Sequence, residues 1–212
     1  MFGLLRDFEF CHKTIREIVK KASENHYLVR IDMEDSQCTD LELRLFQRLY
    51  HEFPENVGVV LQSYLKRTFS DLENLKKISD PEFPVNIRLC KGIYIEPESI
   101  AYKEREEINT NFLKCLDLMF ANNIFPAIAT HDNKLIWESI ALVSKYGKST
   151  RDYEFQMLYG VTPRLRDKLV DKGHTMRVYV PYGQQWFQYS TRRLKENPHL
   201  VRDIILGFLV KK

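Results

Sequence analysis

The ten residues from Val85 to Tyr94 read VNIRLCKGIY, and they carry the pattern that decides the fold of this chain. Residues 85–90 form a short and mostly apolar run, which is typical of a β-strand. The polar residues Arg88 and Lys91 stand at or just beyond the carboxyl end of that run. The same arrangement, a short apolar run that ends on polar side chains, recurs along the chain.

Six such runs alternate with longer stretches in which apolar residues recur at helical spacing. The predicted strands are 27–33, 57–62, 85–90, 125–130, 153–158 and 175–181, and the predicted helices are 8–23, 40–52, 69–78, 103–121, 132–146, 163–172, 184–196 and 198–210. The strands begin about 22–40 residues apart, which is the size of one strand with its following helix. Alternating strands and helices predict an α/β fold with a parallel sheet.

The ends of the strands distinguish an open doubly wound sheet from a closed barrel. A nucleotide-binding doubly wound sheet has a glycine-rich turn after its first strand. The sequence contains no GxGxxG or GxxxxGK[ST], and its eight glycines do not cluster. Polar residues stand instead at the end of every predicted strand, where a barrel gathers them on one rim. They are Asp32 and Glu34, Gln62, Arg88 and Lys91, Thr130 and His131, Glu154 and Gln156, and Tyr179.

Bulk properties exclude several classes of protein. The formal net charge of the 212 residues is +3 and the basic residues are evenly spread, which does not favour nucleic-acid binding. The sequence has no apolar run of roughly 20 residues and no signal peptide, so we expect a cytoplasmic protein. No CxxC pair occurs, so neither zinc nor a redox dithiol is indicated. The four cysteines are expected to be free thiols, and they are Cys11, Cys38, Cys90 and Cys115.

The segment YVPYGQQWFQYSTRRL, residues 179–194, leads from the last predicted strand into a helix. On that helix Tyr189 precedes Arg192 and Arg193 by three and four residues, so all three can face one side. Paired guanidinium groups suit a carboxylate or a phosphate. The alternative is a solvated arginine pair bridged to Glu196. Four neighbouring aromatic residues favour anion binding, because a surface pair seldom has such neighbours.

Six segments together resemble the proline dehydrogenase family. They are IDMED (31–35), VVLQSYLKRT (59–68), RLCKGIY (88–94), ATHD (129–132), EFQMLYG (154–160) and YVPYG…YSTRR (179–193), in the order of the family. The resemblance implies a (β/α)8 TIM-barrel fold with noncovalent FAD at the carboxyl rim. It also implies oxidation of L-proline to Δ1-pyrroline-5-carboxylate, the first step of proline catabolism, with electrons passed to a membrane quinone. Transient contact with the inner face of the membrane is therefore expected.

The resemblance implies roles for residues around the substrate. Arg192 and Arg193 would pair with the proline carboxylate. The walls of the apolar pyrrolidine site would be Tyr179, Tyr189, Tyr94 and Leu89. Asp32 would lie at the floor of the site near Tyr179 and order it. In this family a tyrosine at position 179 narrows the pocket, so L-proline is expected to be preferred over trans-4-hydroxyproline.

The resemblance also implies a set of cofactor-binding residues. Arg88 and Gln62 would bind the edge of the isoalloxazine ring, with Arg88 near N5. The remaining parts of FAD would be held by Lys91, Gly92, Thr130, His131 and Glu154. A glycine at position 92 suits a backbone that approaches a cofactor closely.

Simpler readings of some residues stay open. Tyr94 and Tyr189 could be packing aromatics. Asp32 could cap the helix predicted at 40–52, although Asp35 or Ser36 is better placed for that. His131 with Asp132 could suggest a metal, but no second histidine stands at ligand spacing, so no metal is expected. Trp137 is expected in the core.

The chain departs from the family pattern at its beginning. The family barrel has eight strands, whereas six are predicted here within one barrel domain, residues 1–212. The first four residues, MFGL, resemble the end of a family segment that follows the second strand. We therefore expect the first two βα units to be missing, together with a lysine that completes the carboxylate clamp. Such a barrel has two open edges, and the lost lysine would cost about 1.5–3 kcal/mol of substrate binding.

Three functions follow from these observations. The first is a flavin-dependent proline dehydrogenase, intact if the upstream segment is encoded elsewhere. The second is an inactive truncated remnant that binds FAD weakly or not at all. The third is another barrel enzyme that grips a phosphorylated metabolite with Arg192 and Arg193. The order of the six segments favours the first two. The sequence carries no signal for the oligomeric state.

Overall fold

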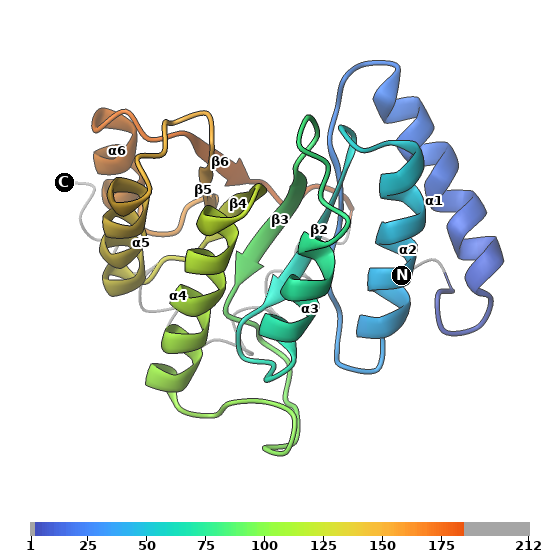
Figure 1. Ribbon diagram of the computed structural model, residues 1–212, viewed down its shortest axis with the longest axis horizontal. Coiled ribbons are helices and arrows are strands. Elements are labelled where there is room, and N and C mark those ends of the chain that lie inside the picture. The colour runs from blue at the N-terminus through green and yellow to red at the C-terminus, as the bar shows by residue number, and fades with distance from the viewer. Residues whose placement is uncertain (1–2, 185–212) are drawn as a thin grey trace.

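The computed structural model describes residues 3–184. Helices and strands alternate strictly along this part of the chain, as Figure 1 shows. The elements are α1 (Phe8–Ser23), β1 (Val29–Ile31), α2 (Thr39–Glu52), β2 (Val57–Gln62), α3 (Thr68–Lys76), β3 (Val85–Cys90), α4 (Arg105–Ala121), β4 (Ile124–Ala129), α5 (Asn133–Lys145), β5 (Glu154–Leu158), α6 (Pro163–Asp171) and β6 (Met176–Tyr179).

The six strands form one parallel sheet in chain order, from β1 to β6. The register pairs Val60 with Arg88, Arg88 with Ala127, and Ala127 with Glu154. The sheet is curled, and the helices cover its outer side (Figure 1). This confirms the predicted fold class, an α/β fold of the TIM-barrel type with six parallel strands.

Most boundaries agree with the sequence, and the differences have physical reasons. Strand β1 is confined to Val29–Ile31 because it pairs only with β2 and over those three residues. The predicted side-chain cap of α2 is wrong: its N-cap is Cys38, which makes no capping hydrogen bond. Asp35 instead accepts from the Gln37 amide, and Ser36 binds Glu96 in the loop after β3. The helices predicted at 184–196 and 198–210 lie outside the described residues, apart from residue 184.

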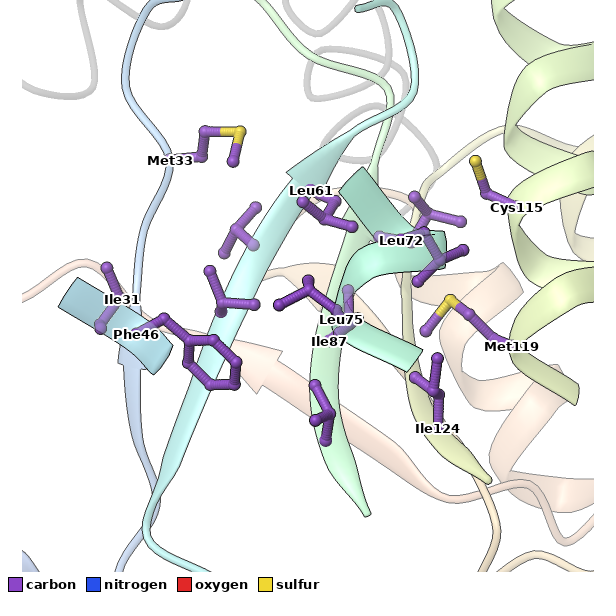
Figure 2. Close-up of a cluster of buried hydrophobic side chains, with 14 of the residues drawn as sticks. Ile31, Met33, Phe46, Leu61, Leu72, Leu75, Ile87, Cys115, Met119 and Ile124 are labelled. Carbon is purple, nitrogen blue, oxygen red and sulfur yellow. The ribbon is translucent and has the colours of Figure 1, made fainter. Parts of the chain in front are cut away.

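The hydrophobic core lies between the sheet and the helices that cover it. Figure 2 shows its central part, in which side chains from strands β1 to β4 meet side chains from α2, α3 and α4. Burying a side chain of this size stabilises the fold by about 1.5–3 kcal/mol. The labelled members are Ile31, Met33, Phe46, Leu61, Leu72, Leu75, Ile87, Cys115, Met119 and Ile124.

Strand β3 shows how the two faces of the sheet divide. Its burial alternates along the strand, and Ile87 and Leu89 are completely buried in the core. Successive side chains of a strand point to opposite faces, so Arg88 and Cys90 face the inner, concave side. Trp137 does not belong to the core as predicted. It is half-buried on α5, with the ammonium groups of Lys168 and Lys172 4.9 and 4.8 Å from its ring centroid.

The described cysteines Cys11, Cys38, Cys90 and Cys115 are all free. Among residues 3–184, no helix combines the length and the apolar character needed to cross a membrane.

Candidate active site

Polar side chains meet on the inner face of the curled sheet. Arg88 of β3 donates from Nε to Oε1 of Gln156 on β5 at 2.7 Å, and so reaches past β4. Strand β4 leaves room for this contact because Ala127, the register partner of both Arg88 and Glu154, has only a methyl group. Gly58 of β2, the register partner of Arg30 and Asn86, leaves room in the same way for a contact between β1 and β3. There Arg30 donates from Nη2 to Oδ1 of Asn86 at 2.7 Å.

Arg88 lies at the centre of this constellation. Its Nη1 is 3.5 Å from Oδ1 of Asp32, which follows β1. Its guanidinium carbon is 5.6 Å from the ring centroid of Tyr179 at the end of β6. Asp32, Arg88 and Tyr179, which have predicted roles at the substrate and the flavin, therefore lie on or directly after three different strands and meet around one guanidinium group. The Arg88 side chain is 17% exposed, so it is accessible at one side and anchored at the other.

Glu154 lies deeper on the same face than the sequence suggested. It is the first residue of β5 and is 3% exposed. Arg177 of β6 donates from Nε to both of its oxygens at 2.9 and 3.0 Å, and Gln156 donates to Oε1 at 2.6 Å. Glu154 was predicted to be one of the residues that hold FAD, and its carboxylate is enclosed by these partners at the amino end of the strand.

Arg30 is the most deeply buried cation of the inner face. Its side chain is 8% exposed, and its Nη2 is 3.8 Å from Oε1 of Glu154. Its Nη1 is buried without a hydrogen-bond partner among the described residues. Burial and, next, the nearby charge of Arg88 lower the pKa of the Arg30 guanidinium to about 9. The inner face thus has positive charge that the surrounding carboxylates do not fully balance.

Gln62 ties the end of β2 to the loop that carries Asp32. It is 2% exposed, and its Nε2 donates to the carbonyl oxygen of Glu34 at 2.8 Å. That loop is also held from α2, where the buried Glu42 accepts from the Glu34 amide at 3.1 Å. The predicted position of Gln62 at the rim is therefore supported, with its amide nitrogen already engaged.

A second polar cluster joins the loops after β3 and β4. Lys91 and Arg105 both donate to Oδ2 of Asp132, at 2.6 and 2.7 Å. Burial opposes ionisation of Asp132, but these two hydrogen bonds outweigh it and hold the pKa of that carboxyl well below its usual range. Asp132 also caps α5 through the Lys134 amide at 3.0 Å. Two cations therefore lie at a helix amino terminus, an arrangement that suits an anion.

Thr130 and His131 lie beside this cluster. The Thr130 hydroxyl accepts from the Asp132 amide at 3.1 Å. Nε2 of His131 accepts from the backbone amide of Leu158 at 3.0 Å, which links the loop after β4 to the end of β5. The structure thus brings together Lys91, Thr130 and His131, three residues predicted to bind the cofactor.

The structure gives a reason for a glycine at position 92 that the sequence did not suggest. Its φ is +100°, and a Cβ atom there would lie 2.1 Å from the ring of Tyr64. Tyr64, rather than a bound group, explains the glycine. Tyr94, two residues on, is partly buried and packs against the hydrophobic core.

Leu89 does not fit its predicted role beside the substrate. It is completely buried on the helix side of the sheet, because it follows the inward-facing Arg88. An aliphatic residue that does face the inner side is Leu158, which shares that face with Glu154 and Gln156 and pairs in register with Tyr179.

Three predicted substrate residues lie outside the described residues, namely Tyr189, Arg192 and Arg193. Sequence reasoning in turn missed several residues of the inner face. Arg30 and Arg177 are charged residues inside otherwise apolar strands. A charged residue at such a position could have indicated that they belong to the inner face. Leu158 could have been found by counting alternate residues from Glu154.

The comparisons with known proteins agree with this geometry. The family model "Proline dehydrogenase" matches residues 4–202. Proline dehydrogenase 2 of Bacillus subtilis (strain 168) is 36% identical over 99% of this chain and 67% of its own length. Proline dehydrogenase of Deinococcus radiodurans is 35% identical over 92% of this chain and 61% of its own length.

Among solved structures, the chain is similar to proline utilization A (PutA) from Bdellovibrio bacteriovorus inactivated by N-propargylglycine. The TM-score is 0.83 at 29% identity, over 90% of this chain and 22% of that one. The chain therefore spans about two thirds of the curated relatives and about a fifth of this larger protein. A match of this extent and identity settles the family: the chain belongs to the proline dehydrogenase family.

Proposed function

We propose that this chain carries the catalytic barrel of an FAD-dependent proline dehydrogenase. The enzyme oxidises L-proline to Δ1-pyrroline-5-carboxylate and passes the electrons to a quinone. The observation that carries the proposal is the anchored guanidinium of Arg88, with Asp32 and Tyr179 around it. Family membership is the basis for the proposed reaction. The side chains around Arg88 are the proposed place at which it occurs.

The residues present fit a flavin. Among the described residues, three guanidinium groups (Arg30, Arg88 and Arg177) face two carboxylates (Asp32 and Glu154), which leaves one excess positive charge in this part of the inner face. The flavin would accept a hydride from a ring carbon of proline and gain negative charge. Such a charge is favoured in this field, because fixed cations stabilise charge that develops in a site of low dielectric.

The proposal gives the rim residues the following roles. Arg88 would face the N5 edge of the ring, and Gln62 would present its amide oxygen at the rim. Lys91 and the start of α5 would face the phosphates, with Thr130 and His131 beside them. Arg192 and Arg193 would grip the proline carboxylate, while Tyr94, Tyr179 and Tyr189 would enclose the pyrrolidine ring.

Quinones are membrane lipids, so this proposal includes transient contact of a cytoplasmic enzyme with the inner face of the membrane. The contact can be measured by sedimenting the purified protein with quinone-containing vesicles. Binding to vesicles without quinone serves as the comparison.

The proposed function is tested by proline-dependent reduction of an artificial electron acceptor. The full-length protein should reduce the acceptor only when L-proline is present. Arg88→Met should lower kcat/KM by at least tenfold, which corresponds to the loss of one charged interaction of about 1.5–3 kcal/mol. Tyr153→Phe is the control, because it removes the buried hydrogen bond to His174 and leaves the inner face intact. Equal activity of wild type and Arg88→Met would refute the proposed site.

A further inference from the structure

Gln156 links the guanidinium group of Arg88 to a charged group below it. Its Oε1 accepts from Arg88 at 2.7 Å, and its Nε2 donates to Glu154 at 2.6 Å. Gln156 is 4% exposed and Glu154 is 3% exposed, so water does not compete for these bonds. The chain of contacts continues to Arg177, which donates to both oxygens of Glu154 at 2.9 and 3.0 Å.

Chemistry permits only one orientation of this amide. A guanidinium group only donates hydrogen bonds, and a carboxylate only accepts them. Gln156 must therefore turn its oxygen toward Arg88 and its NH2 group toward Glu154. The carboxylate of Glu154 cannot rotate away, because Arg177 holds both of its oxygens.

We propose that Glu154, Gln156 and Arg177 form a relay that fixes the orientation of the Arg88 guanidinium group in the active site. The inference rests on the proposed function, because Arg88 acts there on the flavin edge. The three relay residues are positioning residues, and they act through Arg88. Glu154 takes this role in place of the cofactor contact that the sequence suggested.

Asp32, the acidic partner of Arg88, cannot replace the relay in fixing the guanidinium group. Asp32 lies 3.5 Å from Nη1, and its side chain is 56% exposed. An exposed ion pair at this distance contributes little, whereas a buried and charge-assisted hydrogen bond is strong. The inner-face anchor of Arg88 is therefore Nε, and only Gln156 binds that atom among the described residues.

The first test removes the relay at its middle. Gln156→Leu keeps a side chain of similar size but removes both hydrogen bonds. In the full-length enzyme we expect kcat for L-proline to fall about tenfold or more, with a much smaller change in KM, because the proposal assigns the substrate carboxylate to residues other than Arg88. The reduction potential of the bound flavin should fall as well, because a positive charge is no longer held at its edge. Tyr153→Phe, which loses one buried hydrogen bond of the same region, should change neither quantity.

The second test exchanges the amide and the carboxylate. Gln156→Glu alone brings two carboxylates within the 2.6 Å contact and should lower both activity and melting temperature. Glu154→Gln added to it restores a complementary pair, since the new amide donates to the new carboxylate, which accepts from Arg88. The composition and net charge are then those of the wild type. We expect kcat to recover by about tenfold relative to Gln156→Glu. The reduction potential should lie below that of the wild type, because the negative charge now touches Arg88.

The outcomes separate the two proposals. No proline oxidation by the wild type would overturn the proposed function and the relay with it. An active wild type with unchanged kcat and potential in Gln156→Leu would overturn the relay alone. A double variant no better than Gln156→Glu, at equal content of folded protein by circular dichroism, would also overturn it.

Discussion

Glu42 makes the stability of this protein depend on pH in a direction unusual for a carboxyl group. It lies on α2 with no exposed surface, and within residues 3–184 its two oxygens accept only from the Glu34 amide, at 3.1 and 3.3 Å. Burial raises the pKa of Glu42 to about 7, although the hydrogen bond from Glu34 opposes the rise. The negative charges of Glu34 and Asp32 raise it further.

The sign follows from proton binding in the two states. The unfolded chain loses the Glu42 proton near its ordinary pKa of 4.5, whereas the folded protein keeps it up to about pH 7. Between these values the folded state holds more protons, so stability falls as the pH rises and levels off above about pH 7. A difference of about 2.5 pH units at about 1.4 kcal/mol each gives about 3.5 kcal/mol for the complete titration.

The assay is urea unfolding of wild type and Glu42→Gln between about pH 5 and pH 8. Glutamine can still accept from the Glu34 amide but does not titrate. The wild type should therefore lose about 2.5 kcal/mol more than the variant over this range, because part of the total loss already occurs below pH 5. Glu73→Gln is the control, because Glu73 is exposed on α3 and its replacement should leave the wild-type pH dependence intact. The same pH dependence in Glu42→Gln and wild type would refute the reasoning.

Three further predictions concern the rim. Gly92→Ala should cost at least about 2 kcal/mol of unfolding free energy, because φ is +100° and the new Cβ would meet the Tyr64 ring at 2.1 Å; a melting temperature equal to that of the wild type would contradict this. Arg193→Met should raise KM for proline at least tenfold and leave the flavin spectrum unchanged, as expected from the loss of one charged hydrogen bond; an unchanged KM would count against the carboxylate clamp. The kcat/KM for L-proline should exceed that for trans-4-hydroxyproline if Tyr179 narrows the pocket, and comparable values would show that it does not.

Much of the fold could be predicted because apolar periodicity determines it. Helix α1 and strands β2 and β3 have the predicted bounds, since each has a clear buried stripe or run. The short β1 could not be predicted, because the length of an edge strand depends on its one neighbour. The helix start at α2 was predicted to within one residue, but the capping residue was predicted wrongly because Asp35 and Ser36 have other partners.

Side chains of the site that lie at strand ends could be predicted from the sequence. Contacts that depend on the curvature of the sheet could not. The sequence predicted that Arg88 and Asp32 lie near one another, because polar residues at strand ends are visible in the sequence. The relay from Arg88 to Arg177 was not, because it joins strands that meet only when the sheet curls. The role given to Leu89 failed for a simpler reason, since alternation with Arg88 turns it toward the helices.

The most direct measurement is the visible spectrum of the purified full-length protein during anaerobic addition of L-proline. The account predicts a bound flavin whose absorbance bleaches with L-proline and not with glycine. It also predicts that Arg88→Met binds flavin but bleaches at least tenfold more slowly, as loss of a single charged contact requires. A protein that binds no flavin after reconstitution with FAD, or whose flavin does not respond to proline, would contradict the account.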